Sequence, residues 1–101
     1  MTRRAAKVDA NQAAVVDALR KAGCSVQSLA AVGKGVPDLL VGRLGRNWLL
    51  EVKDGALPPS ARTLTDDQVA WHAAWRGQVV VVESVRRALQ VVGLLESDEK
   101  K

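Results

Sequence analysis

An α/β fold with four strands and three helices, in the order helix, three strands, helix, strand, helix, is predicted by three features of the sequence. An amphipathic segment lies near the start, two short apolar segments joined by a glycine turn lie in the middle, and four consecutive valines lie between two segments with helix-capping residues. At 101 residues the chain can bury one modest core. We therefore expect a single domain over residues 1–101, with a frayed tail from about residue 96.

The first helix is predicted at Asn11–Ala22, because apolar residues recur there at helical spacing and Gly23 follows as a stop signal. Cys24–Leu29 is then predicted to be a strand. Its alternation of apolar and polar residues falters at Gln27 and Ser28, which favours an edge position or a bulge.

The middle of the chain predicts a hairpin and then a helix. Asp38–Gly42 and Asn47–Lys53 are apolar enough to be two largely buried strands. After a loop at residues 54–64, the second helix is predicted at Asp66–Arg76. A capping box, Thr65-x-x-Gln68, precedes this helix, and a glycine at position 77 follows it.

The last third of the chain predicts one more strand and one more helix. Gln78–Glu83 contains the four valines and is expected to be a buried strand. Ser84 is a good cap for a third helix that reaches about Val92. The tail Glu96–Lys101 is expected to fray in solvent and to have no function.

The register of the predicted hairpin brings charged residues together. A two-residue turn at Leu44-Gly45 places Asp38 directly opposite Glu51. Because side chains alternate along a strand, Lys53 emerges on the same face as Glu51. Two carboxylates that face each other repel, so the pair requires a cation or a proton between them.

These residue types suit the hydrolysis of a phosphodiester. A divalent metal held by oxygen ligands stabilises the negative charge that develops at phosphorus, and magnesium is usually bound by one or two carboxylates. A lysine beside the metal can orient the attacking water and offset charge. The backbone carbonyl of Val52, between Glu51 and Lys53, is a further candidate ligand. The sequence therefore predicts a site for Mg²⁺ or Mn²⁺.

The composition is that of an ordinary globular protein. Hydrophobic residues make up 48% and charged residues 26%, and the longest apolar runs are too short for a membrane helix. The formal net charge of +4 favours polyanionic partners. A lone Cys24 cannot form an internal disulfide, which agrees with a reducing compartment. We expect a cytoplasmic protein without a membrane partner.

The motifs resemble those of a known family. Gly35-Val36-Pro37-Asp38-Leu39-Leu40-Val41-Gly42, then Glu51-Val52-Lys53, then Leu64-Thr65-Asp66-Asp67-Gln68, is similar to the VRR-NUC group of PD-(D/E)xK nucleases, especially the small stand-alone form encoded by phages. The resemblance covers nearly the whole chain. It implies a restriction-endonuclease-like core, in which helices flank a mixed four-stranded sheet.

The same resemblance implies roles for particular residues. Asp38 and Glu51 would be metal ligands together with the carbonyl of Val52, and Lys53 would be the catalytic lysine. The stand-alone members are similar to Holliday-junction resolvases and tend to be homodimers. The resemblance therefore implies a structure-specific DNA endonuclease that acts as a homodimer on branched or four-way-junction DNA in a bacterial cytoplasm.

Two glutamines leave alternatives open. The family's first helix often carries a glutamate that helps to hold metal-bound water, and Gln12 stands there in this chain, so a second metal site is in question. Gln12 is also compatible with a role at the helix start. Gln68 matches a family position that lines the active site, and it could instead only complete the capping box.

Two basic residues are candidates for DNA contacts. Lys34, between two glycines, lies immediately before the catalytic strand, where the backbone can approach a phosphate closely. Arg62 lies in the long loop after Lys53, which could serve as a substrate-binding flap. Each could also be an ordinary solvated residue.

The remaining candidates carry weaker signals. His72 could contact phosphate, although a lone histidine on a helix is more often a packing residue. Trp71 and Trp75 lie four residues apart on one helical face, which favours a core or dimer-interface role over base stacking, and Trp48 has the same interpretation. A catalytically silent DNA-binding module and a protein-interaction module are the alternatives to a nuclease.

Overall fold

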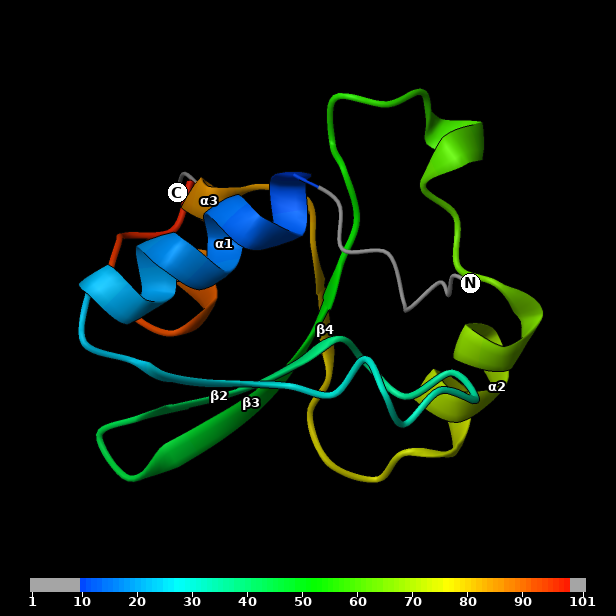
Figure 1. The fold of residues 1–101 in the computed structure, drawn as a ribbon, viewed down its shortest axis with the longest axis horizontal. Coiled ribbons are helices and arrows are strands. Elements are labelled where there is room, and N and C mark those ends of the chain that lie inside the picture. Colours follow the sequence, from blue (N-terminus) through cyan, green and yellow to red (C-terminus); the bar gives the residue numbers. More distant parts are fainter. Residues whose placement is uncertain (1–9, 99–101) are drawn as a thin grey trace, which may run out of the picture.

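The computed structural model describes residues 10–98. It has the predicted order of elements, with one additional short 3₁₀ helix, η1, in the loop before the second helix (Figure 1). The elements are α1 (Ala10–Lys21), β1 (Ser25–Ser28), β2 (Leu39–Arg43), β3 (Arg46–Val52), η1 (Pro59–Ala61), α2 (Asp66–Ala74), β4 (Val80–Val82) and α3 (Val85–Val91). Among these described residues, none of the helices combines the length and apolar character that a membrane span requires.

The four strands form one mixed sheet in the order β1-β2-β3-β4. Strands β1, β2 and β3 are successively antiparallel, whereas β4 runs parallel to β3 and is reached through the segment that contains α2. Since β1 lies at one edge, the edge position predicted for the first strand is confirmed. The predicted α/β class and mixed sheet are confirmed as well.

Helices α1 and α3 pack together over one face of the sheet (Figure 1). Alternate strand residues point to these helices and are buried, as expected for a period of two. The centre of this core consists of fully buried residues from α1, β2, β3, β4 and the end of α3: Val15, Leu19, Leu39, Val41, Leu50, Val82 and Val92. Trp48 is buried in the same core, so its predicted core role is confirmed.

Helix α2 lies at one end of the sheet, apart from α1 and α3 (Figure 1). It has no buried residue. Consequently the second face of the sheet is only partly covered, and Leu40 and Val81 on that face are each 37% exposed. The position of α2 turns out to matter for the site, because its first two turns lie over the charged end of β3.

The end of α2 differs from the sequence-based expectation. The helix stops at Ala74 rather than Arg76, because Trp75 is the C-cap residue and has extended backbone angles. Gly77 is therefore not the helix-terminating residue that the pattern predicts. Its role is close packing, since a Cβ at this position would lie 2.9 Å from the indole nitrogen of Trp75.

The fourth strand and the tail also differ from expectation. Strand β4 is shorter than the predicted Gln78–Glu83 and only Val82 is fully buried, because β4 is an edge strand and the face that carries Val81 is open. In the tail, Asp98 forms an ion pair of 2.7 Å with Arg86, so this part is held against α3 rather than frayed. Residues 99–101 lie outside the described part of the chain.

Candidate active site

The hairpin β2–β3 has the register that the sequence predicts. Leu44 and Gly45 form its two-residue turn with φ angles of 53° and 76°, the left-handed pair that matches the twist of the flanking strands. The pairs from Arg43–Arg46 to Leu39–Leu50 follow without a bulge. Continuing this register by one residue brings Asp38 opposite Glu51.

Asp38 is fixed at the start of β2 by two hydrogen bonds. Its backbone carbonyl accepts a bond of 2.8 Å from the N–H of Leu29 in the β1 segment. Its side-chain Oδ2 accepts a bond of 2.7 Å from the N–H of Val52. The carboxylate is therefore held against the end of β3, beside Glu51.

Glu51 is a buried acid whose side chain is 1% exposed. Burial raises its pKa to about 8, and Asp38 adds to the increase through its charge and a side-chain hydrogen bond, while Lys53 acts in the opposite direction. Its Oε1 atom is buried without a hydrogen-bond partner. A buried carboxyl group with an unsatisfied oxygen and a second carboxylate beside it is a strained arrangement that a bound cation would relieve.

Gln68 connects the acid to the lysine. Its Nε2 donates to Oε2 of Glu51 at 3.0 Å, and its Oε1 accepts from Nζ of Lys53 at 3.0 Å. The same Oε1 also accepts from the backbone N–H of Thr65, which completes the predicted capping box. Gln68 therefore caps α2, as predicted, and also contacts Glu51 and Lys53, while its role in an active site stays a prediction.

Close packing of the loop before β2 positions α2 over the site. Gly35 has a φ of 84°, and a Cβ there would overlap the carbonyl of Asp67 in the first turn of α2. Only glycine fits such an approach in this backbone conformation. The loop that leads to Asp38 and the helix that carries Gln68 are consequently in direct contact.

His72 is one turn beyond Gln68 on α2 and points into the same site. Its Nε2 is 3.6 Å from Oε1 of Glu51. Burial lowers the pKa of His72, and the charge of Lys53 lowers it further. Sequence reasoning gave His72 little weight. The available signal was its spacing of four residues from Gln68, which places both side chains on one helical face.

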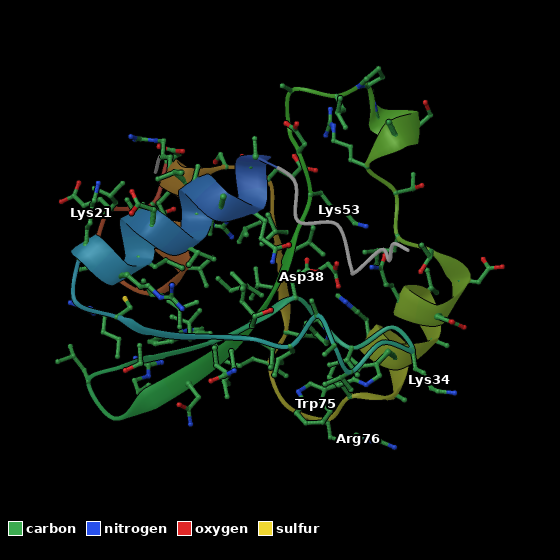
Figure 2. The ribbon with its side chains drawn as sticks, viewed as in Figure 1. Lys21, Lys34, Asp38, Lys53, Trp75 and Arg76 are labelled. Atoms are coloured by element: carbon green, nitrogen blue, oxygen red, sulfur yellow. The ribbon has the colours of Figure 1, made fainter. Side chains whose placement is uncertain are left out.

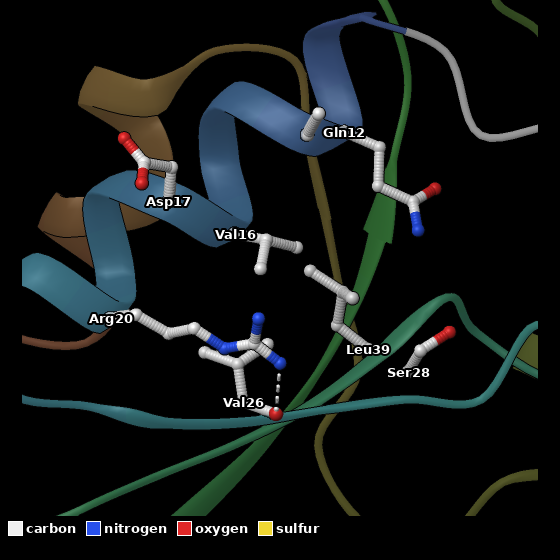
Figure 3. A pocket seen from close by; sticks show the side chains of 8 residues that line it. Gln12, Val16, Asp17, Arg20, Val26, Ser28 and Leu39 are labelled. Carbon is white, nitrogen blue, oxygen red and sulfur yellow. Dashed lines mark hydrogen bonds between the residues drawn. The ribbon is translucent and has the colours of Figure 1, made fainter.

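Asn11 is a second residue that sequence reasoning missed. Its Nδ2 donates to the carbonyl of Lys53 at 2.7 Å and so ties the start of α1 to the end of β3. The neighbouring Gln12 is buried on α1 and lines a cavity of about 380 Å³ between α1 and β1, with Val16, Arg20 and Leu39 among the other lining residues (Figure 3). The sequence offers no pattern that singles out Asn11.

The two predicted DNA-contacting residues differ in their surroundings. Lys34 is exposed on the loop that packs on α2 (Figure 2). Its φ of 59° is unusual for a residue other than glycine. Arg62 is engaged within the protein: its guanidinium donates to both carboxylate oxygens of Glu83, at 3.1 and 3.2 Å, and to the carbonyl of Leu57. It therefore fastens the loop between β3 and α2.

The two tryptophans of the α2 segment stack on each other, with ring centroids 4.7 Å apart. Trp71 is half-buried and Trp75 is 44% exposed, so a core role is wrong for this pair. Figure 2 places Trp75, Arg76 and Lys34 on the outer side of the molecule near α2, whereas Asp38 and Lys53 lie nearer its middle. The dimer-interface interpretation of the tryptophans stays a prediction.

The donor set fits a hard divalent cation. Asp38 and Glu51 supply carboxylate oxygens, and Oε1 of Glu51, which is buried without a hydrogen-bond partner, can still accept a bond. No group of three or more histidine, cysteine, aspartate or glutamate side chains suited to a metal occurs within residues 10–98.

Comparison with known proteins agrees with the overall fold. A solved structure described as a VRR_NUC domain superposes with a TM-score of 0.59 and 27% sequence identity, and the match covers 81% of this chain and 94% of that one. This match supports membership of the VRR-NUC family. No family model and no curated protein matches it. The mixed sheet with its helices is consistent with the VRR-NUC fold, and the match suggests a nuclease-type domain.

Proposed function

We propose that this VRR-NUC protein is a metal-dependent DNA endonuclease of the PD-(D/E)xK type, with Mg²⁺ or Mn²⁺ as its cofactor. The observation that carries the proposal is the buried Glu51 carboxyl beside Asp38, with Lys53 linked to it through Gln68. An arrangement of two acids and a lysine at the end of a sheet is costly for folding. Phosphodiester hydrolysis gives each of these groups a use.

Asp38, Glu51 and the Val52 carbonyl are the groups that would hold the metal. The cation would supply positive charge to the scissile phosphate and lower the pKa of a bound water. Val52 donates its N–H toward Asp38. Since the N–H and C=O of a strand residue point to the same side, the Val52 carbonyl also faces Asp38.

Lys53 carries the second role. Its ammonium group is held by Oε1 of Gln68 at 3.0 Å, on the same side of β3 as Glu51. In that position it can orient the attacking water and offset the negative charge that develops on the phosphate. Gln68 thus fixes the spacing between the acid and the lysine.

A branched DNA substrate and a homodimer complete the proposal. The net charge of +4 favours a polyanion, and Lys34 is an exposed lysine on the loop that packs against α2. The open sheet face exposes the apolar side chains of Leu40 and Val81, and exposed apolar surface of this kind can mark a protein interface. A second copy on that face would bring two sites into one particle, as a symmetric cut of a junction requires.

The activity is tested with a four-way junction and a linear duplex, each with Mg²⁺ or with EDTA. We expect metal-dependent cutting that favours the junction. Lys53→Ala should lower kcat by about 10²–10³-fold, because an electrostatic contribution of this kind is lost. Lys21→Ala is the matched control, since Lys21 is an exposed lysine on α1 that pairs only with Asp17. Cutting in EDTA, or equal cutting by both variants, would refute the mechanism.

The homodimer is tested by light scattering. Leu40→Lys should convert the dimer to a monomer, because it places a charge in the centre of the open face. Leu95→Lys is the control, as Leu95 is exposed to a similar extent, 41%, but follows α3. A monomeric wild type, or a dimer that Leu40→Lys leaves intact, would exclude this interface.

A catalytically silent DNA-binding module is the second candidate. It is favoured by Gln12, which stands where the family often has an acid. Steeply salt-dependent binding to DNA without cleavage under any divalent metal would support it over the endonuclease.

A further inference from the structure

Two buried polar atoms that face each other in the site have no hydrogen-bond partner. They are Oε1 of Glu51 and Nε2 of His72, 3.6 Å apart, on side chains that are 1% and 15% exposed. An unsatisfied buried donor or acceptor is destabilising, because it has lost its hydrogen bonds to water. Because an imidazole nitrogen can carry a proton and a carboxylate oxygen can accept one, a small movement of either side chain would satisfy both atoms.

The other oxygen of Glu51 already has a partner from the same helix. Gln68 donates to Oε2 at 3.0 Å, and His72 follows Gln68 by four residues. Side chains with this spacing lie above one another on one helical face, so α2 reaches both oxygens of the carboxylate at once. Each oxygen keeps a second lone pair for a metal.

We propose that His72 is a positioning residue: its Nε2–H holds Oε1 of Glu51 while Gln68 holds Oε2, so that α2 fixes the plane of the carboxylate for metal binding. This inference rests on the proposed function and adds a residue to it. It gives His72 a use that packing does not supply, because α2 has no buried residue. The contact of its ring with Trp71, at 6.1 Å between centroids, holds the imidazole from the side.

The first test measures Mn²⁺ binding to the DNA-free protein by calorimetry, together with kcat and KM for a junction. His72→Leu keeps the bulk of the side chain and removes the donor, whereas His72→Gln keeps an N–H donor at the end of the side chain. Partners that orient a metal ligand typically contribute about 10–100-fold in affinity. We therefore expect a loss of this size with His72→Leu, with KM for DNA nearly unchanged, and recovery of most of the affinity with His72→Gln.

The alternative results have clear meanings. Wild-type Mn²⁺ affinity in His72→Leu would overturn the inference while leaving the endonuclease proposal intact. An equal loss in His72→Leu and His72→Gln would also overturn it, because the donor would then not be what matters. Thermal unfolding of each variant verifies that it is folded before metal is added.

A second test does not depend on metal or DNA. His72 is the only histidine of the chain, so the imidazole nitrogen signals in an NMR spectrum are assigned without ambiguity. We expect a neutral ring whose proton is on Nε2, next to Oε1 of Glu51, and is protected from exchange. A proton on Nδ1 would overturn the inference. If the wild type neither binds Mn²⁺ nor cuts DNA, the proposed function fails and this spectrum still decides the role of His72.

Discussion

Asp38 and Val52 are joined by a hydrogen bond in which a side chain replaces the backbone partner that a neighbouring strand would supply. Oδ2 of Asp38 accepts from the N–H of Val52 at 2.7 Å, at the point where the ladder between β2 and β3 ends. Pro37, the residue before Asp38, has no N–H and cannot donate to the Val52 carbonyl. The Pro-Asp pair thus ends the ladder, fixes the acid and leaves this carbonyl without that donor.

A comparison of Asp38→Asn with Asp38→Ala separates the two uses of this side chain. Asparagine can still accept from Val52 through its amide oxygen, but it lacks the charge. We expect Asp38→Asn to lose Mn²⁺ binding while its free energy of unfolding stays within about 1 kcal/mol of the wild-type value. Asp38→Ala should lose Mn²⁺ binding and also lower the free energy of unfolding by about 1–3 kcal/mol. Urea unfolding and calorimetry measure the two effects. Retained Mn²⁺ binding by Asp38→Asn would contradict the assignment.

The stability of the metal-free protein should fall with rising pH. Glu51 has a pKa of about 8 in the folded chain against an ordinary value of 4.5, so between these values the folded chain keeps a proton that the unfolded chain has released. Each step up in pH within this window therefore favours unfolding. We expect a loss on the order of a few kcal/mol from about pH 4.5 to about pH 8, measured by urea unfolding in EDTA.

Glu51→Gln provides the control for this pH dependence. Glutamine has nearly the same shape and does not titrate, so the decline across the window should disappear in this variant. A wild type whose stability does not change between these pH values would show that Glu51 ionises as freely in the folded chain as in the unfolded one.

Gln68 both caps α2 and contacts the site, so its two roles can be separated by comparing it with Thr65, which only caps the helix. Thr65→Ala removes only the cap and should cost about 1 kcal/mol of stability with kcat unchanged. Gln68→Ala should cost a similar amount of stability and also lower kcat, because it releases both Glu51 and Lys53. Denaturant unfolding and junction cleavage measure the pair. Equal kcat in the two variants would show that Gln68 is only a capping residue.

The hairpin was predictable from sequence because its determinants are local. Leu44 and Gly45 set a two-residue turn, and this turn fixes which residues of the two strands pair. The capping box of α2 was predictable for the same reason, since Thr65 and Gln68 are three residues apart. The order of the elements followed from such local signals.

What the sequence did not predict depends on contacts between distant segments. The position of α2 depends on the approach of Gly35 to Asp67, and the partial exposure of β4 depends on its place at the edge of the sheet. The contact of His72 with Glu51 spans 21 positions in the chain and follows from where α2 lies. Neither periodicity nor capping signals contain this information.

We expect Lys34 to lower the stability of the folded protein slightly and to contribute to DNA binding. Its φ of 59° is a backbone conformation that is unfavourable for residues other than glycine. Lys34→Gly should therefore leave the free energy of unfolding unchanged or raise it by up to about 1 kcal/mol. The same substitution should weaken DNA binding, and the dependence of DNA affinity on salt concentration should become shallower by about one phosphate contact. Unfolding and salt titrations of DNA affinity measure the two effects. Unchanged DNA affinity would identify Lys34 as an ordinary loop residue.

Arg62 and Glu83 provide a test of whether the loop between β3 and α2 is held by their ion pair. Both Arg62→Ala and Glu83→Gln remove the ion pair, so both should speed proteolysis within residues 54–64, with a change in global stability of less than about 1 kcal/mol because the pair is partly exposed. DNA binding distinguishes the variants. If Arg62 also contacts phosphate, only Arg62→Ala weakens DNA binding, because Glu83→Gln leaves the arginine in place and removes a negative charge. Equal DNA affinities in the two variants, together with equal proteolysis, would restrict Arg62 to fastening the loop.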